Sequence, residues 1–409
     1  MKRLFLHFGR HKCGTTSIQK TLYHNRSKLL ESGFYYPLTG IRVAAHHEIA
    51  EALGNKMPAE REGLLEKLYL ELKSEIQLTN CRNVIISSEQ LQSCNPALVA
   101  NFFRDFDVIP VCYLREQAAY LRSSYLQKVH ATDYAGSVEQ FYQEGFSTDY
   151  RVFLEKWQAA FDRDISVRVF DRGSLTDGDA VRDFLIAIMG LTKEELENLQ
   201  LMSDENPSLS REMLAFKLEY NARGLPNNGT VYFGLGKLSK AKGSKYEIPL
   251  AITDAVRQQY AESNRWVEDN VLTDGQTFSY PLYEGEPLEK VSPEQFDAIL
   301  EDLNAMKERE KAEEREREKK ARQLARQQIR AAKRQAEKEE RQRKRRQQRQ
   351  TEQLKEKMRA EERERRAKVK EEKEKRKADK EKQKLAGQNM GGAPRLLDRV
   401  ASAFNRRTK

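Results

Sequence analysis

The stretch Leu4-Phe5-Leu6-His7-Phe8 is followed at once by Gly9-Arg10-His11-Lys12-Cys13-Gly14-Thr15-Thr16-Ser17. The first five residues form a short apolar run, which is typical of a buried strand. The next nine contain two glycines, Gly9 and Gly14, separated by four residues, and they open a helical pattern. Such a turn lets backbone amides and the positive end of the helix dipole approach a phosphate closely. The stretch therefore predicts a strand, an anion-binding loop and a helix in direct succession.

The position of the lysine in this loop separates two classes of phosphate site. A nucleoside-triphosphate loop places Lys directly after the second Gly, where it reaches the β- and γ-phosphates, and then a Ser or Thr for magnesium. Here Thr15 follows Gly14, and Lys12 lies inside the loop. A P-loop nucleotide kinase or nucleoside triphosphatase is therefore the weaker enzyme interpretation, and the sequence shows no obvious magnesium-binding acidic motif.

Three further β-rich runs, at 83–88, 108–114 and 165–170, alternate with amphipathic stretches in the first 300 residues. The amphipathic stretches, with apolar residues at three- and four-residue spacing, cover 16–30, 60–76, 117–129 and 138–161. This alternation predicts an α/β fold: a P-loop-like, three-layer α/β/α domain around a central parallel sheet. Ligands of such sheets bind at the carboxyl ends of the strands, where we expect the site residues.

The charge of the chain is divided unevenly. Of its 73 Lys and Arg and 63 Asp and Glu residues, 39 basic and 22 acidic ones fall in residues 301–409, a net charge of +17. Residues 1–300 hold the other 34 basic and 41 acidic residues, a net charge of −7, so a main domain that binds nucleic acid is not expected. We expect a domain at 1–300, a highly charged helix or disordered spacer at 301–385, and a short basic amphipathic segment at 386–409.

Cysteine usage and hydropathy bear on the compartment. The four cysteines, Cys13, Cys81, Cys94 and Cys112, show neither a CxxC pair nor a metal-ligand spacing. No window of eighteen uncharged apolar residues occurs, and the apolar run after Met1 is too short for the core of a signal peptide. We therefore expect a cytoplasmic protein with reduced thiols and no structural metal.

The loop and its surroundings resemble sulfotransferases that use 3′-phosphoadenosine 5′-phosphosulfate (PAPS) as donor. The run from Leu6 to Gln19 and the segment Gly33-Phe34-Tyr35-Tyr36-Pro37 are similar to bacterial members associated with glycan and cell-surface sulfation. His11 stands where that family usually has Pro, and the resemblance covers residues 1–275. It implies transfer of a sulfuryl group from PAPS to a hydroxyl of a carbohydrate or glycoconjugate, with no metal required.

A second motif carries the same resemblance. The family holds the 3′-phosphate of the donor with an Arg at a strand end and a Ser eight residues later on the next helix. Arg115 follows the run 108–114, and Ser123 lies at that offset, with Ser124 as a fallback. About two helical turns separate the helix start from Ser123, so both share a face, and a guanidinium can grip a phosphate through two hydrogen bonds. The resemblance implies donor contacts at Arg10, His11, Lys12, Cys13, Gly14, Thr15, Thr16, Ser17, Arg115 and Ser123, with Lys12 at the bridging or leaving oxygen.

A general base must take the proton of the acceptor hydroxyl, and three residues are candidates. His46 and His47 open a helix after an acceptor-side loop, and His46 is the first choice because family members look similar around it. Glu89 ends the second β-rich run, at the same expected edge of the sheet. Helix-start positions without a catalytic role fit these patterns equally well. His7 and His11 are expected to pack or to face solvent.

Two later segments, Asn206-Pro207-Ser208-Leu209-Ser210 and Asn264-Arg265-Trp266, look like parts of the same family without an assigned role. Between them we expect a loop at 234–245, either a basic lid over bound phosphates or a solvated loop. Its lysines are Lys237, Lys240, Lys242 and Lys245.

Residues 304–384 are almost entirely Glu, Lys, Arg, Gln and Ala and predict a helix. Apolar residues are too few and irregular for the seam of a coiled coil, so a single solvated helix fits better, with disorder as the alternative. The basic cluster at 341–349 could contact RNA or anionic lipid, but no aromatic residues accompany it, so nucleic acid is not the expected partner. A scaffold or RNA-binding protein that acts through this tail is the rival interpretation outside enzymology.

The final segment, 386–409, predicts a short basic amphipathic helix. Leu396, Leu397, Val400 and Phe404 fall on one face, with arginines around them. Such a helix can lie on an anionic membrane surface, which would attach the enzyme peripherally at the inner face of a membrane, or it can dock on a partner. A terminal helix without a role fits the pattern equally well.

Overall fold

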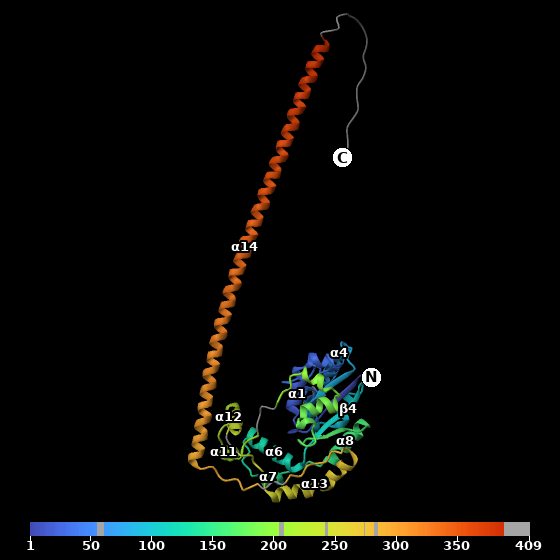
Figure 1. The fold of residues 1–409 in the computed structure, drawn as a ribbon, viewed down its shortest axis with the longest axis vertical. Helices are drawn as coiled ribbons and strands as arrows, with labels where there is room; N and C mark the ends of the chain where they lie inside the picture. Colours follow the sequence, from blue (N-terminus) through green and yellow to red (C-terminus); the bar gives the residue numbers. More distant parts are fainter. Residues whose placement is uncertain (55–60, 204–207, 242–243, 274, 282–284, 388–409) are drawn as a thin grey trace. The chain divides into compact units, whose positions relative to one another are not determined.

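The computed structural model describes residues 1–54, 61–203, 208–241, 244–273, 275–281 and 285–387 (Figure 1). The chain divides into two compact units, Met1–Glu310 and a second unit that begins at Lys311. The first unit contains the sheet and the helices packed on it, and the second contains most of one long helix.

A parallel sheet of five strands forms the centre of the first unit, in the order β2-β3-β1-β4-β5. Its strands are β1 (Arg3–His7), β2 (Phe34–Tyr35), β3 (Asn83–Ser87), β4 (Asp107–Leu114) and β5 (Ser166–Val169). The central β1 pairs in parallel with both β3 and β4. The predicted α/β fold with a parallel sheet is confirmed, and all four predicted strands form; the two-residue β2 was not predicted as a strand.

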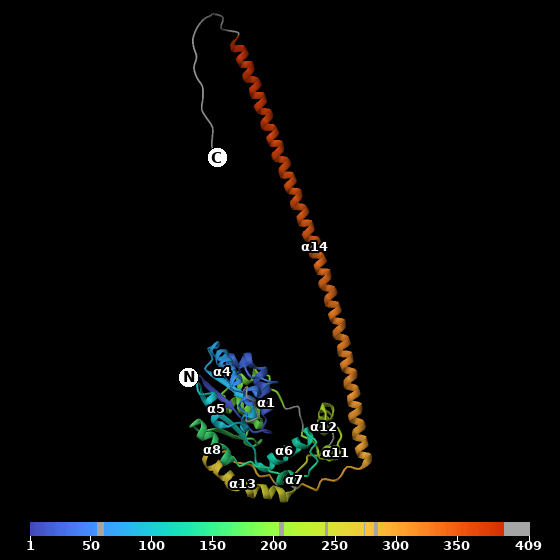
Figure 2. The ribbon, with the colours of Figure 1, turned by 180° about the vertical axis from the view of Figure 1, so that it is seen from behind.

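Helices cover both faces of the sheet, which gives three layers (Figure 2). Alternation along β1 sends Leu4 and Leu6 to one face, against α8 (Tyr150–Phe161), and Phe5 to the other, against α1 (Thr15–His24). The α-helices are α1 (Thr15–His24), α2 (Arg26–Glu31), α3 (His47–Leu53), α4 (Arg61–Gln77), α5 (Pro96–Phe102), α6 (Gln117–Ala131), α7 (Val138–Gln143), α8 (Tyr150–Phe161), α9 (Ala180–Asp183), α10 (Lys193–Glu197), α11 (Arg211–Ala222), α12 (Gly229–Ala241), α13 (Leu250–Asn270) and α14 (Pro293–Gly387). Shorter helical turns are η1 (Glu89–Ser93), η2 (Thr176–Gly178) and η3 (Phe184–Ile188).

A second hydrophobic core lies outside the sheet. Residues of α6, α11, α12 and α13 pack together there with Phe296 and Leu303 from the start of α14. Phe296 stacks on Phe216 of α11, with ring centroids 4.8 Å apart. The first turns of α14 therefore belong to the core of the first unit.

The helix predicted over 138–161 is wrong as one element, because it is broken between α7 and α8. Gly145 lies there with a φ of 115°, a conformation that a helix excludes. Asp149 then caps α8, since its carboxylate accepts a hydrogen bond from the amide of Val152 at 3.1 Å. The stretch 16–30 is likewise divided, at Asn25, into α1 and α2.

The loop predicted at 234–245 is also wrong, because α12 continues to Ala241. Gly234 lets the start of α14 pack closely, since a Cβ at this position would lie 2.5 Å from Leu303. Lys237 does not cover a phosphate site, because its ammonium pairs with Glu310 at 2.7 Å. Lys242 lies outside the described residues.

The second unit confirms the predicted helix of the tail. Ion pairs at i,i+4 spacing, such as Arg317 with Glu313 and Arg376 with Glu372, accompany two regions of α14, residues 313–322 and 362–376. The amphipathic segment predicted at 386–409 lies almost entirely outside the described residues. In the part of the chain that the structure describes, no helix has the length and apolar character needed to cross a membrane.

Candidate functional site

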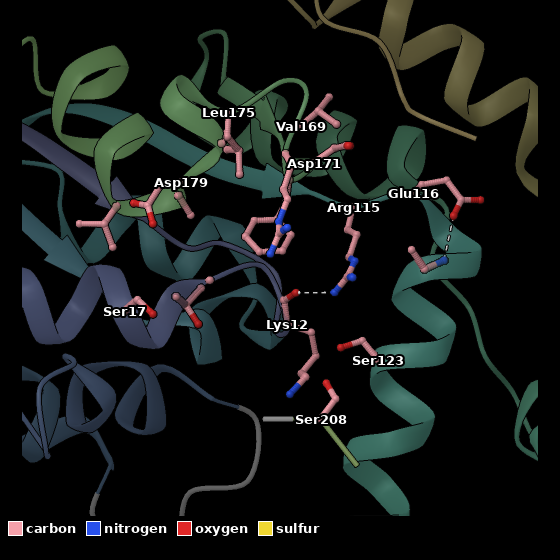
Figure 3. Close-up of a pocket in the computed structure, with 18 of the residues that line it drawn as sticks. Lys12, Ser17, Arg115, Glu116, Ser123, Val169, Asp171, Leu175, Asp179 and Ser208 are labelled. Atoms are coloured by element: carbon pink, nitrogen blue, oxygen red, sulfur yellow. Dashed lines mark hydrogen bonds between the residues drawn. The ribbon is translucent and has the colours of Figure 1, made fainter. Parts of the chain in front are cut away.

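The segments that follow β1, β4 and β5 meet around one pocket at the carboxyl edge of the sheet (Figure 3). The pocket has a volume of about 700 Å³. It brings together seven of the predicted donor residues, Lys12, Gly14, Thr15, Thr16, Ser17, Arg115 and Ser123. Two motifs a hundred residues apart in sequence thus share one cavity, because parallel strands end at the same edge.

Gly14 is required at its position by its surroundings. Its φ is 73°, and a Cβ there would lie 2.8 Å from the ring of Phe170 and 2.9 Å from Ala180. Both its backbone conformation and this close approach exclude a side chain. α1 begins at the next residue, so the first-turn amides of Thr15, Thr16 and Ser17 have no partner within the helix and are available for an anion.

Lys12 has a strained backbone conformation, and both its carbonyl oxygen and its ammonium form hydrogen bonds. Its φ is 64°, in the left-handed region that a residue with a side chain seldom adopts. Its carbonyl oxygen accepts a hydrogen bond from Arg115 at 3.3 Å, and its ammonium donates to Oε1 of Gln127 at 3.1 Å. Gln127 in turn donates to the hydroxyl of Tyr232 at 3.5 Å. The lysine is therefore linked to the strand end, to α6 and to α12.

Arg115 and Ser123 lie on the other side of the pocket. Arg115 directly follows β4, and Ser123 stands two turns into α6, with both side chains directed toward Lys12 in Figure 3. The neighbouring Arg122 is buried in an ion pair with Glu247, whose other oxygen accepts from Lys245 at 2.9 Å. A smaller cavity of about 240 Å³ continues from this side and shares Arg115, Arg122, Ser123 and Lys245 with the main pocket. The side of the pocket at Arg115 therefore has three cations, of which Arg122 and Lys245 share Glu247 as partner.

Sequence reasoning missed a third wall of the pocket, which follows β5. Phe170, Asp171 and Arg172 line it directly after that strand, and the segment 175–181 continues it. The signal for this wall is present in the sequence, because the fourth predicted strand, at 165–170, ends there. Ser208, in a segment that had no assigned role, also lines the pocket.

Three predicted donor residues, Arg10, His11 and Cys13, do not line the pocket. The guanidinium of Arg10 lies 4.9 Å from the ring centre of Phe153 and donates to Thr148 at 2.8 Å. Cys13 is packed in the core, and burial raises the pKa of its thiol to about 12. In the tight loop neighbouring side chains point in different directions, so Lys12 reaches the pocket while Cys13 fills the core.

His46, the first choice for the base, is fully buried with both ring nitrogens occupied. Its Nδ1 accepts from the amide of Ser87 at 3.1 Å, and its Nε2 donates to the carbonyl of Pro37 at 3.1 Å. Burial lowers the pKa of His46 to about 4, so the ring is neutral. These contacts attach the start of α3 to the end of β3 and leave no nitrogen for an acceptor.

His47 and Glu89 are placed differently, near each other and partly exposed. His47 Nδ1 is 2.9 Å from the hydroxyl of Ser88, and its Nε2 is 3.9 Å from Oε1 of Glu89. The other oxygen of Glu89 accepts from Gln19 on α1 at 2.7 Å. A histidine and a carboxylate thus stand together where β3 ends and α3 begins, and neither is among the residues that line the pocket.

Other residues of the late segments have structural roles. Asn264 donates to Gln117 at 2.7 Å, which joins α13 to the first turn of α6. Ser210 caps α11 by accepting from the amide of Met213 at 3.3 Å. Among the described residues, no three His, Cys, Asp or Glu side chains gather closely enough to hold a metal ion.

Comparisons with known proteins give a limited picture. No family model matches the chain. An uncharacterized protein from Archaeoglobus fulgidus is 34% identical over 131 residues, which are 31% of this chain and 35% of that protein. The chain therefore matches about a third of the length of this relative. A sulfotransferase from Alicyclobacillus acidocaldarius is a weakly similar solved structure, with a TM-score of 0.32 and 18% identity over 54% of this chain and 93% of that one.

Proposed function

We propose that this protein transfers a sulfuryl group from PAPS to a hydroxyl of a carbohydrate or glycoconjugate. One observation carries the proposal: Lys12, residues 14–17, Arg115 and Ser123 line a single pocket. A donor with phosphate groups at two separate positions needs two anion sites joined by a cavity, and this pocket offers both. The rival enzyme interpretation, a nucleotide kinase, needs a lysine at the position that Thr15 occupies.

The residues present suit this donor in size and charge. About 700 Å³ is within the range of pockets that enclose a nucleotide-sized ligand. The first-turn amides of α1 and the hydroxyls of Thr15, Thr16 and Ser17 would hold the 5′-phosphosulfate. Arg115 and Ser123 would hold the 3′-phosphate, and Phe170 offers a ring surface beside them. PAPS supplies the sulfuryl group and an anionic leaving group.

Lys12 is the residue that we assign to the leaving oxygen. Sulfuryl transfer proceeds in line between two oxygens, and negative charge builds on the departing phosphate, so a positioned cation lowers the barrier. The amide of Gln127 holds the ammonium of Lys12 without neutralising its charge.

His47, supported by Glu89, is the base that we propose for the acceptor hydroxyl. A neutral histidine nitrogen can accept the proton, and the adjacent carboxylate stabilises the resulting imidazolium. The structural contacts of His46 favour His47 over it, although both were candidates.

Calorimetric titration with 3′-phosphoadenosine 5′-phosphate, the product of the donor, tests the proposal. We expect metal-independent binding by the wild type that Arg115→Ala weakens by about a hundredfold, because a charge-assisted bidentate contact is lost. Arg104→Ala removes an exposed arginine that precedes the amino end of β4, whereas the pocket lies at the carboxyl ends of the strands, and it should leave binding unchanged. A preference for ATP with magnesium, or equal effects of the two substitutions, would contradict the proposal.

A further inference from the structure

Residues 326–349 of α14, termed here the basic stretch, concentrate the charge of the tail. Its eleven basic residues are Arg326, Arg330, Lys333, Arg334, Lys338, Arg341, Arg343, Lys344, Arg345, Arg346 and Arg349. Only Glu337, Glu339 and Glu340 are acidic, so the net charge is +8 over 24 residues. At 1.5 Å per residue this helix segment is about 36 Å long.

The basic stretch differs from its flanks in how its cations are paired. Before it, Arg317, Lys320 and Arg322 each have a glutamate partner four residues away. After it, four more such pairs form between residues 362 and 376. Within it, only Lys344 of the eleven cations makes an ion pair with a described residue. The flanks thus neutralise themselves, whereas the basic stretch presents its charge to solvent.

The kind of cation changes as well. The basic stretch contains eight Arg and three Lys, whereas residues 350–382 contain five Arg and nine Lys. The planar guanidinium binds two oxygens of a sulfate, phosphate or carboxylate at once, and a lysine ammonium does not. This composition indicates recognition of oxyanions rather than only solubility.

The arrangement of the cations distinguishes among polyanions. Successive helical residues are separated by 100°, so the six cations within 341–349 surround the helix on all sides. A flat membrane surface meets one side only, and Ile329 is the sole large apolar side chain of the basic stretch. Aromatic residues, on which bases of single-stranded nucleic acid stack, are absent from the sequence between Phe296 and Phe404. A flexible polyanion that needs neither stacking nor insertion fits best.

We propose that the basic stretch binds a sulfated polysaccharide, the polymeric product of the transfer reaction. The choice of this polyanion rests on the proposed function, because each transfer adds an anionic group to the acceptor. A polymer held by one part of the chain is present at high effective concentration for the other part, as in any linked pair of binding modules. Binding should therefore favour repeated sulfation of one polymer.

Binding of the full-length chain to dextran sulfate, measured by fluorescence anisotropy at several salt concentrations, tests this inference. Uncharged dextran, poly(U) and vesicles containing phosphatidylserine are the comparison probes. The test variant carries glutamine at Arg341, Arg343, Lys344, Arg345, Arg346 and Arg349. The control variant removes the same charge from the ion-paired region, by glutamine at Arg363, Arg365, Arg366, Lys368, Lys375 and Arg376. Glutamine retains the helix, which circular dichroism verifies.

We expect the wild type to bind dextran sulfate and not dextran, with affinity that falls as salt rises. The test variant should lose affinity on the order of tenfold or more. The control variant should lose much less, because four of its six cations are already paired with glutamates. Equal losses in both variants, or tighter binding of poly(U) or vesicles than of dextran sulfate, would overturn the inference.

The outcome is separable from that of the proposed function. Lys12→Ala and Arg115→Ala should leave dextran sulfate binding intact, because both residues belong to the first unit. If the bisphosphate fails to bind while dextran sulfate does, the transfer reaction is wrong and the polyanion surface stands. If the bisphosphate binds and dextran sulfate does not, only the present inference fails.

Discussion

At the scale of single residues, Gln127 is the neighbour that orients the side chain of Lys12. Its amide oxygen faces the ammonium at 3.1 Å, and the hydroxyl of Tyr232, as acceptor from the amide nitrogen, fixes that orientation. His130 stacks on Tyr232 with ring centroids 4.0 Å apart. The position of the lysine is therefore determined by a chain of side chains from α6 and α12.

Replacement of Gln127 should lower catalysis rather than donor binding. Gln127→Leu removes the contact that positions the ammonium, and we expect kcat to fall about tenfold, as for loss of a hydrogen bond to a charged group. Affinity for 3′-phosphoadenosine 5′-phosphate should change by less than about twofold, because Arg115 and the loop amides remain. The rate of bisphosphate release from PAPS with a soluble glycan acceptor measures kcat, and calorimetric titration measures the affinity for the bisphosphate. Gln158→Leu on α8 is the matched control, and an unchanged kcat in Gln127→Leu would refute the role.

Three buried histidines make the first unit sensitive to acid. Burial lowers the pKa of His7, His46 and His130 to about 4 each. In the unfolded chain they take up protons as the pH falls below about 6.5, but in the folded chain they resist protonation until about 4. Acid therefore favours unfolding, and the stability present above pH 6.5 is lost as the pH falls toward 4.

The free energy of unfolding should fall steeply between pH 6.5 and pH 4, by up to about 3 kcal/mol for each of these histidines. Urea unfolding at pH 7.5, 6.0 and 5.0 measures it. His46→Gln should be less stable than the wild type at pH 7.5, because it disturbs the contacts with Ser87 and Pro37. As the pH falls, its free energy of unfolding should nevertheless decrease less than that of the wild type, because unfolding of the variant takes up about one proton fewer. Parallel pH profiles of variant and wild type would show that His46 is not protonated on unfolding.

At the scale of elements, the turn between β1 and α1 depends on close packing as much as on backbone freedom. Gly14 and Gly33 both have positive φ, but only Gly14 has neighbours within reach of a Cβ. Gly14→Ala should destabilise the unit by about 1–3 kcal/mol and weaken bisphosphate binding, because the loop must move away from Phe170.

Gly33→Ala is the control for this prediction. It places an alanine at a positive φ, as Gly14→Ala does, but its Cβ has no neighbouring atom within 4 Å. Unfolding and calorimetric titration of both variants separate the two effects. A loss of bisphosphate binding in Gly33→Ala as large as in Gly14→Ala would show that packing against Phe170 is not the cause.

At the scale of the whole molecule, the division into units predicts where the chain can be shortened. A chain that ends at Glu310 keeps Phe296 and Leu303 in the helical core and should retain its melting temperature and its bisphosphate binding. A chain that ends at Ser292 loses both side chains, which should cost roughly 2–5 kcal/mol for each large apolar group removed. Thermal unfolding of the two truncated chains measures this difference. If both melt alike, the start of α14 is not part of the core.

The sequence by itself determined the succession of β1, loop and α1, the parallel sheet and the helical tail. These features depend on neighbours within a few residues: an apolar run, two glycines, and alternating charges with no Gly or Pro to interrupt them. The meeting of the loop with Arg115 and Ser123 was also predictable, because parallel strands place their carboxyl ends at one edge.

Only the tertiary structure decided which of these residues face the pocket. Cys13 and Lys12 are adjacent in sequence, yet one packs in the core and the other lines the cavity. His46 and His47 also differ: the carbonyl of Pro37 and the amide of Ser87 occupy both nitrogens of His46, whereas His47 is partly exposed beside Glu89. The physical reason is that burial and hydrogen-bond partners come from segments distant in sequence, and a local pattern contains no information about them.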